Sequence, residues 1–216
     1  ILFVLGGCQG LLGWYMVQSG LVDRPSVSQY RLTAHLGLAV ALFAAIVWQV
    51  LALWPSKEVD RSPVSARASN FALVLLALVY LMILSGGLVA GTDAGFSYPT
   101  WPKMGPGFVP PGLYATTPAW LAAFEDVTTI QFNHRLFAYA LFFLVGGFAL
   151  TLLLRGSDRE LRFAGAGLLG VLLLQLSLGI STLLTHVAVP VAAAHQGGAI
   201  LLLTVMLYSA FILRQR

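Results

Sequence analysis

Six long apolar stretches dominate the sequence, each close to the length that a helix needs to cross a membrane. An α-helix crosses a bilayer core with about 20 apolar residues. Because lipid offers no hydrogen-bond partners to free backbone groups, such segments must be helical. The chain is therefore predicted to be all-α, a polytopic transmembrane helical bundle. The expected spans are residues 1–18, 28–54, 69–90, 128–154, 161–185 and 190–213.

The scarcity of charge supports the same conclusion. Only 9% of the 216 residues are charged and 58% are hydrophobic, whereas soluble domains carry about 25% charged residues. The composition excludes a disordered chain, a nucleic-acid-binding domain and an ordinary soluble enzyme. The lone cysteine, Cys8, lies in an apolar run, and we expect it to be a buried structural thiol.

Positive charges in the loops predict the orientation of the spans. Cytoplasmic loops carry an excess of Lys and Arg, so the chain is expected to begin and end in the cytoplasm. The long loop 91–127 would then lie outside, as an interfacial aromatic belt or as a lid over a pocket. The charges that carry this argument are Lys57, Arg61, Arg67, Arg155, Arg159, Arg162, Arg214 and Arg216.

A glycine pattern at residues 165–170 matches the dinucleotide-binding fingerprint but lacks its context. No strand precedes Gly165, and no acidic residue follows at the required distance. Glycines within a membrane span more often allow helices to pack closely, so we favour that interpretation.

Three histidines are expected at one depth in the membrane. His35, His134 and His195 lie just inside the same ends of three different spans. At a rise of 1.5 Å per residue, they lie roughly 8–11 Å below the outer surface. An ionisable group inside a membrane indicates a functional site, and three on different helices at one depth strengthen that indication. The fourth, His186, lies in a short outer loop and is interpreted as interfacial.

This histidine layer favours a flat cofactor held between helices, with an imidazole on each face of an iron, which is haem. If His134 and His195 take both axial positions, the iron has no free site for oxygen, and the haem suits electron transfer. A proton-relaying transporter is a further alternative. The lack of a clearly placed carboxylate inside the spans argues against it.

An internal repeat relates the first two spans to the last two. Residues 69–216 would form a complete four-helix unit. Residues 1–68 would be the second half of an N-terminal unit, followed by a cytoplasmic linker. We therefore expect six helices here of eight in two pseudo-equivalent four-helix repeats, an arrangement known in membrane proteins. The matched positions are Gln9 with Gln175, Gly13 with Gly179, and residues 34–39 with 194–199.

Several motifs occur in order along the chain: GLLGWYMVQSGL at 10–21, YRLTAHL at 30–36, GGLVAGTDAGF at 86–96, QFNHRL at 131–136 and HQ at 195–196. Together they resemble the haem A synthase family, in its proteobacterial and mitochondrial branch. The resemblance implies a haem-dependent oxidoreductase of eight transmembrane helices in the bacterial inner membrane. Such an enzyme oxidises the C8 methyl of haem O to a formyl group, giving haem A for cytochrome c oxidase.

The resemblance also implies roles for individual residues. His134 and His195 would ligate the iron of a haem b cofactor, and His35 would face the iron of the substrate haem O. Arg135 and Arg31 are candidates to pair with a haem propionate, since arginine suits carboxylate binding; the alternative for both is an arginine that extends its charge to the membrane interface. The family's first two helices are not in this sequence. A second substrate-side histidine and an outer-loop glutamate expected to be catalytic would belong to them.

Several partners and one alternative function remain open. The implied partners are the lipid bilayer and haem O delivered by haem O synthase, with an electron donor that the sequence does not identify. Glycine-rich faces are compatible with packing inside the bundle or against another copy of the chain, and no nucleic acid is expected. The alternative function is a non-enzymatic bis-histidine membrane cytochrome that carries electrons from quinol.

Overall fold

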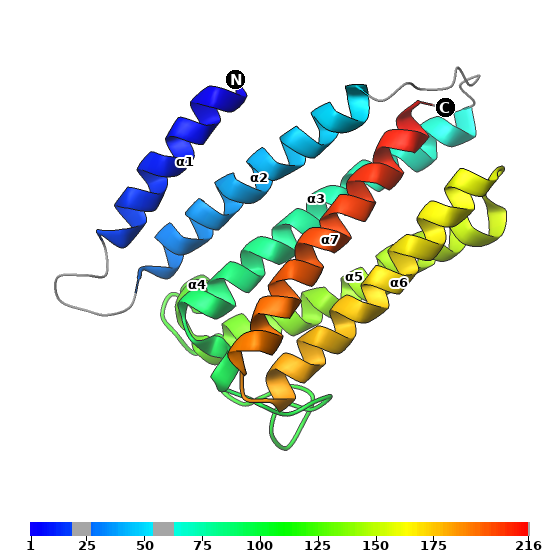
Figure 1. Cartoon of the computed structure of the whole chain (residues 1–216). Coiled ribbons are helices and arrows are strands. Elements are labelled where there is room, and N and C mark those ends of the chain that lie inside the picture. Colours follow the sequence, from blue (N-terminus) through cyan, green and yellow to red (C-terminus); the bar gives the residue numbers. More distant parts are fainter. Residues whose placement is uncertain (19–26, 54–62, 216) are drawn as a thin grey trace.

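In the computed structural model, which describes residues 1–18, 27–53 and 63–215, all the long elements are helices (Figure 1). The all-α prediction is confirmed. Lys57, Arg61 and Arg216, which carry part of the predicted cytoplasmic charge, lie outside the described residues. The long helices are α1 (Leu2–Val17), α2 (Gln29–Leu53), α3 (Pro63–Gly91), α5 (Val127–Arg155), α6 (Arg159–Leu184) and α7 (Val189–Arg214).

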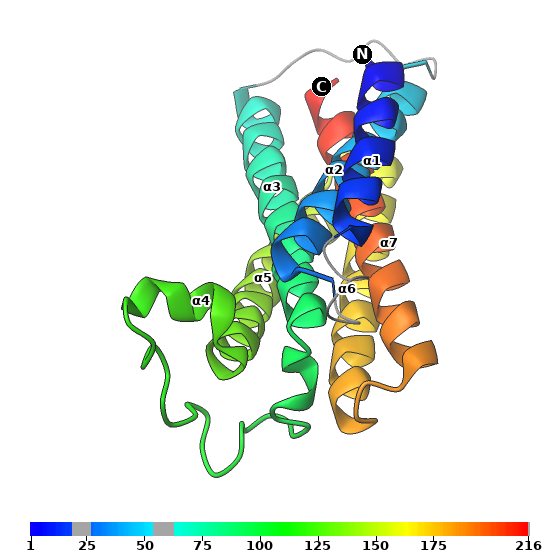
Figure 2. The ribbon, with the colours of Figure 1, turned by 90° about the vertical axis from the view of Figure 1, so that its left-hand side faces the viewer.

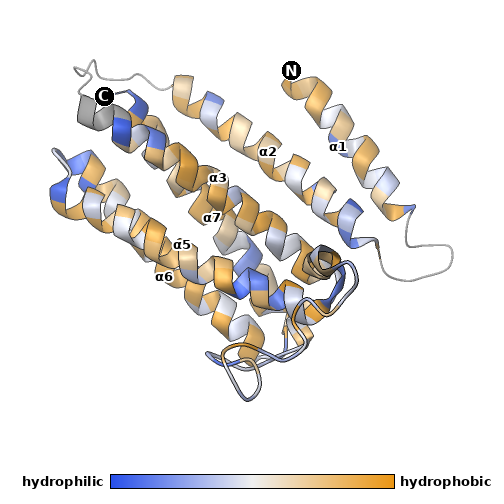
Figure 3. Cartoon of the chain, turned by 180° about the vertical axis from the view of Figure 1, so that it is seen from behind, coloured by the Kyte–Doolittle hydropathy of each residue, from blue (hydrophilic) through white to orange (hydrophobic). Residues whose placement is uncertain are grey.

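Within the described residues, five helices are long and apolar enough to cross a membrane: α2, α3 from Arg67, α5, α6 and α7. Figure 3 shows hydrophobic residues along these helices, with hydrophilic ones toward their ends and in the loops. The sequence predicts six spans, but α1 has only 16 residues, fewer than the ~20 that a bilayer core requires. The chain is an integral membrane protein.

Four helices close into a ring. α3 packs on α5, α5 on α6, α6 on α7, and α7 on α3, so α5 and α7 lie at opposite corners. The ring's core consists of fully buried aliphatic side chains, among them Leu75, Val145, Leu168 and Leu203. In a bilayer these side chains exchange contacts with lipid for close packing against one another, and this van der Waals packing favours the closed arrangement.

The two N-terminal helices lie outside this ring. α2 packs against α3 and α7, and α1 packs on the far side of α2 (Figures 1 and 2). No residue of α1 is buried. Cys8 is exposed, so the expectation of a buried thiol is wrong. The reason is that α1 meets the rest of the protein mainly through the face that contacts α2.

The segment between α3 and α5 is built from short turns and caps. It contains two 3-10 turns, at Ala94–Phe96 and Ala119–Leu121, and the single-turn helix α4 (Ala122–Glu125). Asp126 then caps α5, because its carboxylate accepts a hydrogen bond of 2.7 Å from the backbone N–H of Thr129. Such a cap satisfies a free N–H of the first turn and fixes where α5 begins.

The glycine pattern at 165–170 lies inside α6, and Gly165 has the packing role that the sequence predicts. A Cβ at Gly165 would lie 2.5 Å from the backbone nitrogen of Leu153 and 2.7 Å from the carbonyl oxygen of Ala149, both on α5. A Cβ at Gly170 would meet nothing within 4 Å. Gly165 therefore allows α5 and α6 to approach closely, and Gly170 does not contribute to that contact.

Gly165→Ala should lower the free energy of unfolding by about 1–3 kcal/mol, the usual cost of forcing an extra methyl into a packed contact. Gly170→Ala, on the same helix, is the matched control and should cause no loss. Thermal unfolding of both variants in detergent measures the difference. Equal melting temperatures for the two variants would contradict this account of the α5–α6 contact.

Candidate functional site

The three predicted histidines lie at corresponding positions in their helices. His35, His134 and His195 are each six or seven residues from the first residue of α2, α5 and α7. These helices all begin at one end of the bundle, which we call the histidine end. The rise of 1.5 Å per residue places each histidine about 9–11 Å from its helix start.

His134 is supported by α3. The Oγ of Ser85 lies 2.8 Å from its Nδ1, and a Cβ on the next residue, Gly86, would lie 3.5 Å from its Cε1. α3 thus presents a hydroxyl and then a bare backbone to the imidazole. Because Nδ1 is hydrogen-bonded, Nε2 is the ring nitrogen available to a ligand.

His195 lies on α7, at the corner of the four-helix ring opposite α5, and its imidazole is supported by α6. A Cβ on Gly179 would lie 2.9 Å from its Cε1 and 3.5 Å from its Nδ1, so the imidazole occupies space that only glycine leaves open. Its buried Nδ1 has no hydrogen-bond partner in the described structure, and neither does the Oε1 of Gln175 one turn before Gly179. His195 and His134 lie on α7 and α5, the two opposite helices of the four-helix ring.

His35 repeats this contact on the α1–α2 pair. A Cβ on Gly13 would lie 2.9 Å from its Cε1, 3.5 Å from its Nδ1 and 3.6 Å from its Nε2, the same three distances found at Gly179 and His195. The Nε2 of Gln9 donates to the carbonyl oxygen of His35 at 3.1 Å and lies 3.3 Å from its ring Nε2. The sequence match between the two helix pairs therefore corresponds to a shared contact.

Known proteins are similar to this sequence along its whole length. Residues 1–207 match the profile of a family described as cytochrome oxidase assembly protein, COX15-CtaA. The chain belongs to this family. It is 47% identical over its full length to "Heme A synthase" of Nitrosospira multiformis. It is also 45% identical over 96% of its length to "Heme A synthase" of Nitrosomonas eutropha. The resemblance drawn from the motifs is thus confirmed.

The chain spans about three fifths of the length of these relatives, 61% of the first and 59% of the second. A third relative, "Heme A synthase" of Rhodospirillum centenum, is 40% identical over 99% of the chain, which covers 57% of that protein. The sequence therefore corresponds to the larger part of the length of these relatives.

In this family member, Arg135 holds the long loop. Its Nη2 donates to the carbonyl oxygen of Tyr98 at 2.6 Å, and its Nη1 donates to those of Thr100 at 2.8 Å and Lys103 at 3.4 Å. One turn earlier, the Nε2 of Gln131 donates to the carbonyl oxygens of Gly95 and Tyr98, each at 3.3 Å. In the structure the two terminal nitrogens of Arg135 thus bind loop carbonyls. The pairing of Arg135 with a propionate is not tested by these contacts and stays a prediction.

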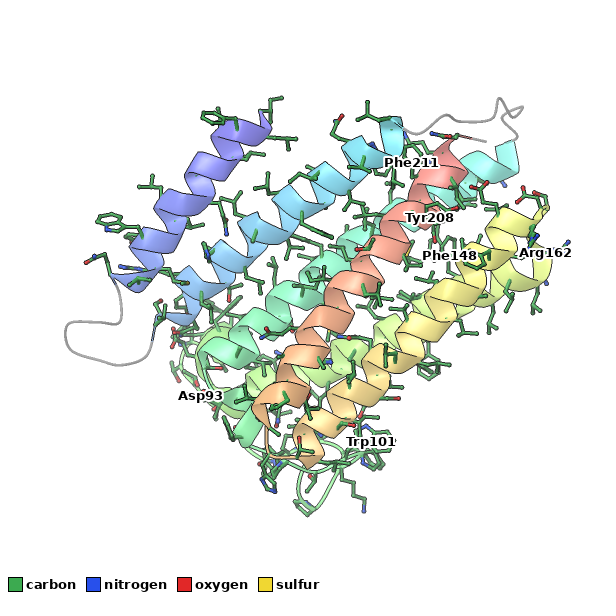
Figure 4. The ribbon with its side chains drawn as sticks, in the orientation of Figure 1. Asp93, Trp101, Phe148, Arg162, Tyr208 and Phe211 are labelled. Carbon is green, nitrogen blue, oxygen red and sulfur yellow. The ribbon has the colours of Figure 1, made fainter. Side chains whose placement is uncertain are left out.

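The anchored loop lies across the histidine end of the bundle. Figure 4 shows Trp101, from this loop, at the end of the bundle at which α6 ends. Met104 is buried within the loop, whereas Trp101 is 44% exposed. Arg31, the other candidate for a propionate, donates from Nη1 to the carbonyl oxygen of Tyr15 at 2.9 Å and stacks over the Tyr15 ring.

Three contributors to the site are not evident from the sequence: Ser85, Gln131 and Glu125. The carboxylate of Glu125 accepts hydrogen bonds from the hydroxyl of Tyr30 and, at 3.1 Å, from the Nε2 of Gln29. A polar residue between apolar ones in a span is the only signal for Ser85. Gln131 belongs to the motif at 131–136, and its position one turn before Arg135 is the signal for its contact with the loop.

Gln131→Ala should loosen the long loop, because it removes two hydrogen bonds, each contributing about 0.5–1.5 kcal/mol. We expect trypsin to cut after the exposed Lys103 roughly fivefold faster or more, a factor that corresponds to about 1 kcal/mol, the lower end for the loss of two such bonds. Quantifying that fragment over time is the measurement. Thr151→Ala is the matched control, since its hydroxyl bonds only within α5. Equal cleavage rates would contradict the anchoring role of Gln131.

Proposed function

We propose that this chain is the larger part of a haem A synthase, an enzyme that oxidises the C8 methyl of haem O to a formyl group. Relatives with that name are similar to this chain over nearly all of its length. The observation that carries the proposal is the pair His134 and His195. They lie on helices at opposite corners of a four-helix ring, each supported by a different neighbouring helix.

The residues of the ring fit a bis-histidine haem b. An iron-ligating histidine usually bonds its other ring nitrogen to a nearby group, and Ser85 provides this partner for Nδ1 of His134. Gly179 leaves the space in which the His195 ring lies. The described residues contain no group of three or more His, Cys, Asp or Glu suited to a bare metal ion. When bound, a bis-histidine haem supplies one-electron transfer.

We assign His35 to the substrate side of the same enzyme. Its contact with Gly13 reproduces that of His195 with Gly179, which supports two equivalent haem-facing units. In this assignment residues 1–68 contribute half of the substrate unit, with His35 facing the iron of haem O. Residues 69–216 form the cofactor unit, and the catalytic acidic residue belongs to neither of these two segments.

We also propose the orientation of the protein in a bacterial inner membrane. The ends of α5 and α7 that carry Arg155 and Arg214 lie opposite the histidine end, and positive charge favours the cytoplasmic side. The histidines and loop 91–127 then face outward, and the C-terminus is cytoplasmic. Haem O would arrive through the bilayer from haem O synthase, and a dimer or larger assembly remains compatible with the exposed helix faces.

Histidine substitutions in the full-length protein separate the two units. His134→Ala and His195→Ala should each abolish the low-spin haem absorption, because each removes an axial ligand. His35→Ala should retain that absorption but lose conversion of haem O to haem A. Absorption spectra, with extraction and chromatography of the haems, give both readouts.

His186→Ala is the matched control, since His186 is exposed in the loop before α7, and it should change neither readout. A low-spin spectrum that persists in His134→Ala would contradict the ligand assignment. Full-length wild-type protein that binds haem but forms no haem A would favour the electron-carrying cytochrome.

The two glycine contacts give a second test. Gly179→Ala should displace His195 and change or abolish the low-spin spectrum, because the new Cβ would lie 2.9 Å from Cε1. Gly13→Ala should leave the spectrum intact and reduce haem A formation. Gly170→Ala and Gly10→Ala are the controls on the same two helices, since a Cβ there meets nothing within 4 Å. A normal spectrum in Gly179→Ala would show that the position of the His195 imidazole does not depend on this glycine.

A further inference from the structure

Arg135 is a buried cation next to a proposed haem ligand. It directly follows His134 in α5 and is only 7% exposed. An arginine side chain stays protonated in proteins, so its charge is present whatever the pH.

The groups around Arg135 do not neutralise this charge. Its three hydrogen-bond acceptors are backbone carbonyl oxygens, from Tyr98, Thr100 and Lys103. Within the described part of the chain, no carboxylate accepts a hydrogen bond from its guanidinium. Carbonyl dipoles solvate the cation but leave its net charge of one, and at low dielectric such a charge acts over a longer distance than in water.

The charge of Arg135 acts on the place where the iron would be held. Arg135 directly follows His134 in α5, so their Cα atoms are about 3.8 Å apart. A bis-imidazole haem iron carries one more positive charge when it is ferric than when it is ferrous. A fixed cation nearby therefore disfavours the ferric state and favours the ferrous state.

We infer that Arg135 raises the reduction potential of the haem held at His134, through its charge rather than by pairing with a propionate. This inference rests on the proposed function, since it requires a haem at His134 and His195. Arg135 does not touch the reacting atoms in this role. It is a tuning residue that acts through the ligand beside it, while its hydrogen bonds hold the long loop.

Redox titration of the full-length, haem-loaded protein tests the inference. Arg135→Gln should lower the midpoint potential. At the wild-type midpoint, the ferric-to-ferrous ratio should rise by about tenfold, equivalent to 59 mV for one electron. Arg135→Lys keeps the charge but not the planar fork, and its midpoint should stay near wild type. The absorption of the low-spin haem follows the titration and does not depend on turnover.

Arg155→Gln is the matched control, since it removes the same charge from an exposed position at the far end of α5. That site is about 30 Å along the helix from Arg135, so its midpoint should not move.

The outcomes separate this inference from the proposed function. An unchanged or higher midpoint in Arg135→Gln overturns the inference and leaves the haem assignment in place. An equal shift in Arg135→Lys and Arg135→Gln also overturns it, because the loop contacts and not the charge would then be responsible. If Arg135→Gln does not retain haem, Arg135→Met, which also removes the charge, takes its place: a lowered midpoint supports the inference and an unchanged or higher one overturns it. Wild-type protein without low-spin haem overturns both proposals.

Discussion

The approach of an imidazole to a bare glycine backbone on the neighbouring helix is the constraint on which the site depends. It occurs at His195 with Gly179 and at His35 with Gly13, with the same three distances. A side chain at either glycine would occupy the space of the ring, so the histidine could not keep its place without moving its helix. The closed ring of α3, α5, α6 and α7 adds the second requirement, because it holds α5 and α7 at opposite corners. The contact with Gly179 thus fixes His195 on the helix opposite to the one that carries His134.

The other support for the site comes from α5 itself. His134 faces Ser85 on α3, while Gln131 and Arg135 on the same helix bind carbonyls of the long loop. One helix therefore carries a proposed haem ligand on one side and the anchors of the loop on another. Burying a guanidinium is costly unless its donors are satisfied, and the loop carbonyls meet that need for both terminal nitrogens. Arg135 thus both holds the long loop in place and supplies the positive charge at this position.

The sequence predicts much of this arrangement, because length, hydropathy and histidine depth are local properties of each span. The all-helical fold, the three histidine positions and the role of Gly165 follow from such patterns. The partners of Arg135 do not, since they are backbone carbonyls that any residue type would present. Cys8 was misjudged because an apolar run does not reveal which helix face is covered, and α1 is covered mainly by α2. Ser85 is missed because its importance depends on which residue of α5 lies opposite.

Two adjacent carboxylates at the histidine end connect helices that are far apart in sequence. Glu125 accepts hydrogen bonds from the first residues of α2, and Asp126 caps the first turn of α5. The beginnings of the two helices are thereby joined through a single peptide link. His35 and His134 each lie a fixed number of residues beyond that link. These surface hydrogen bonds therefore add a direct connection between the helices of His35 and His134 to the one that α3 provides by packing against both.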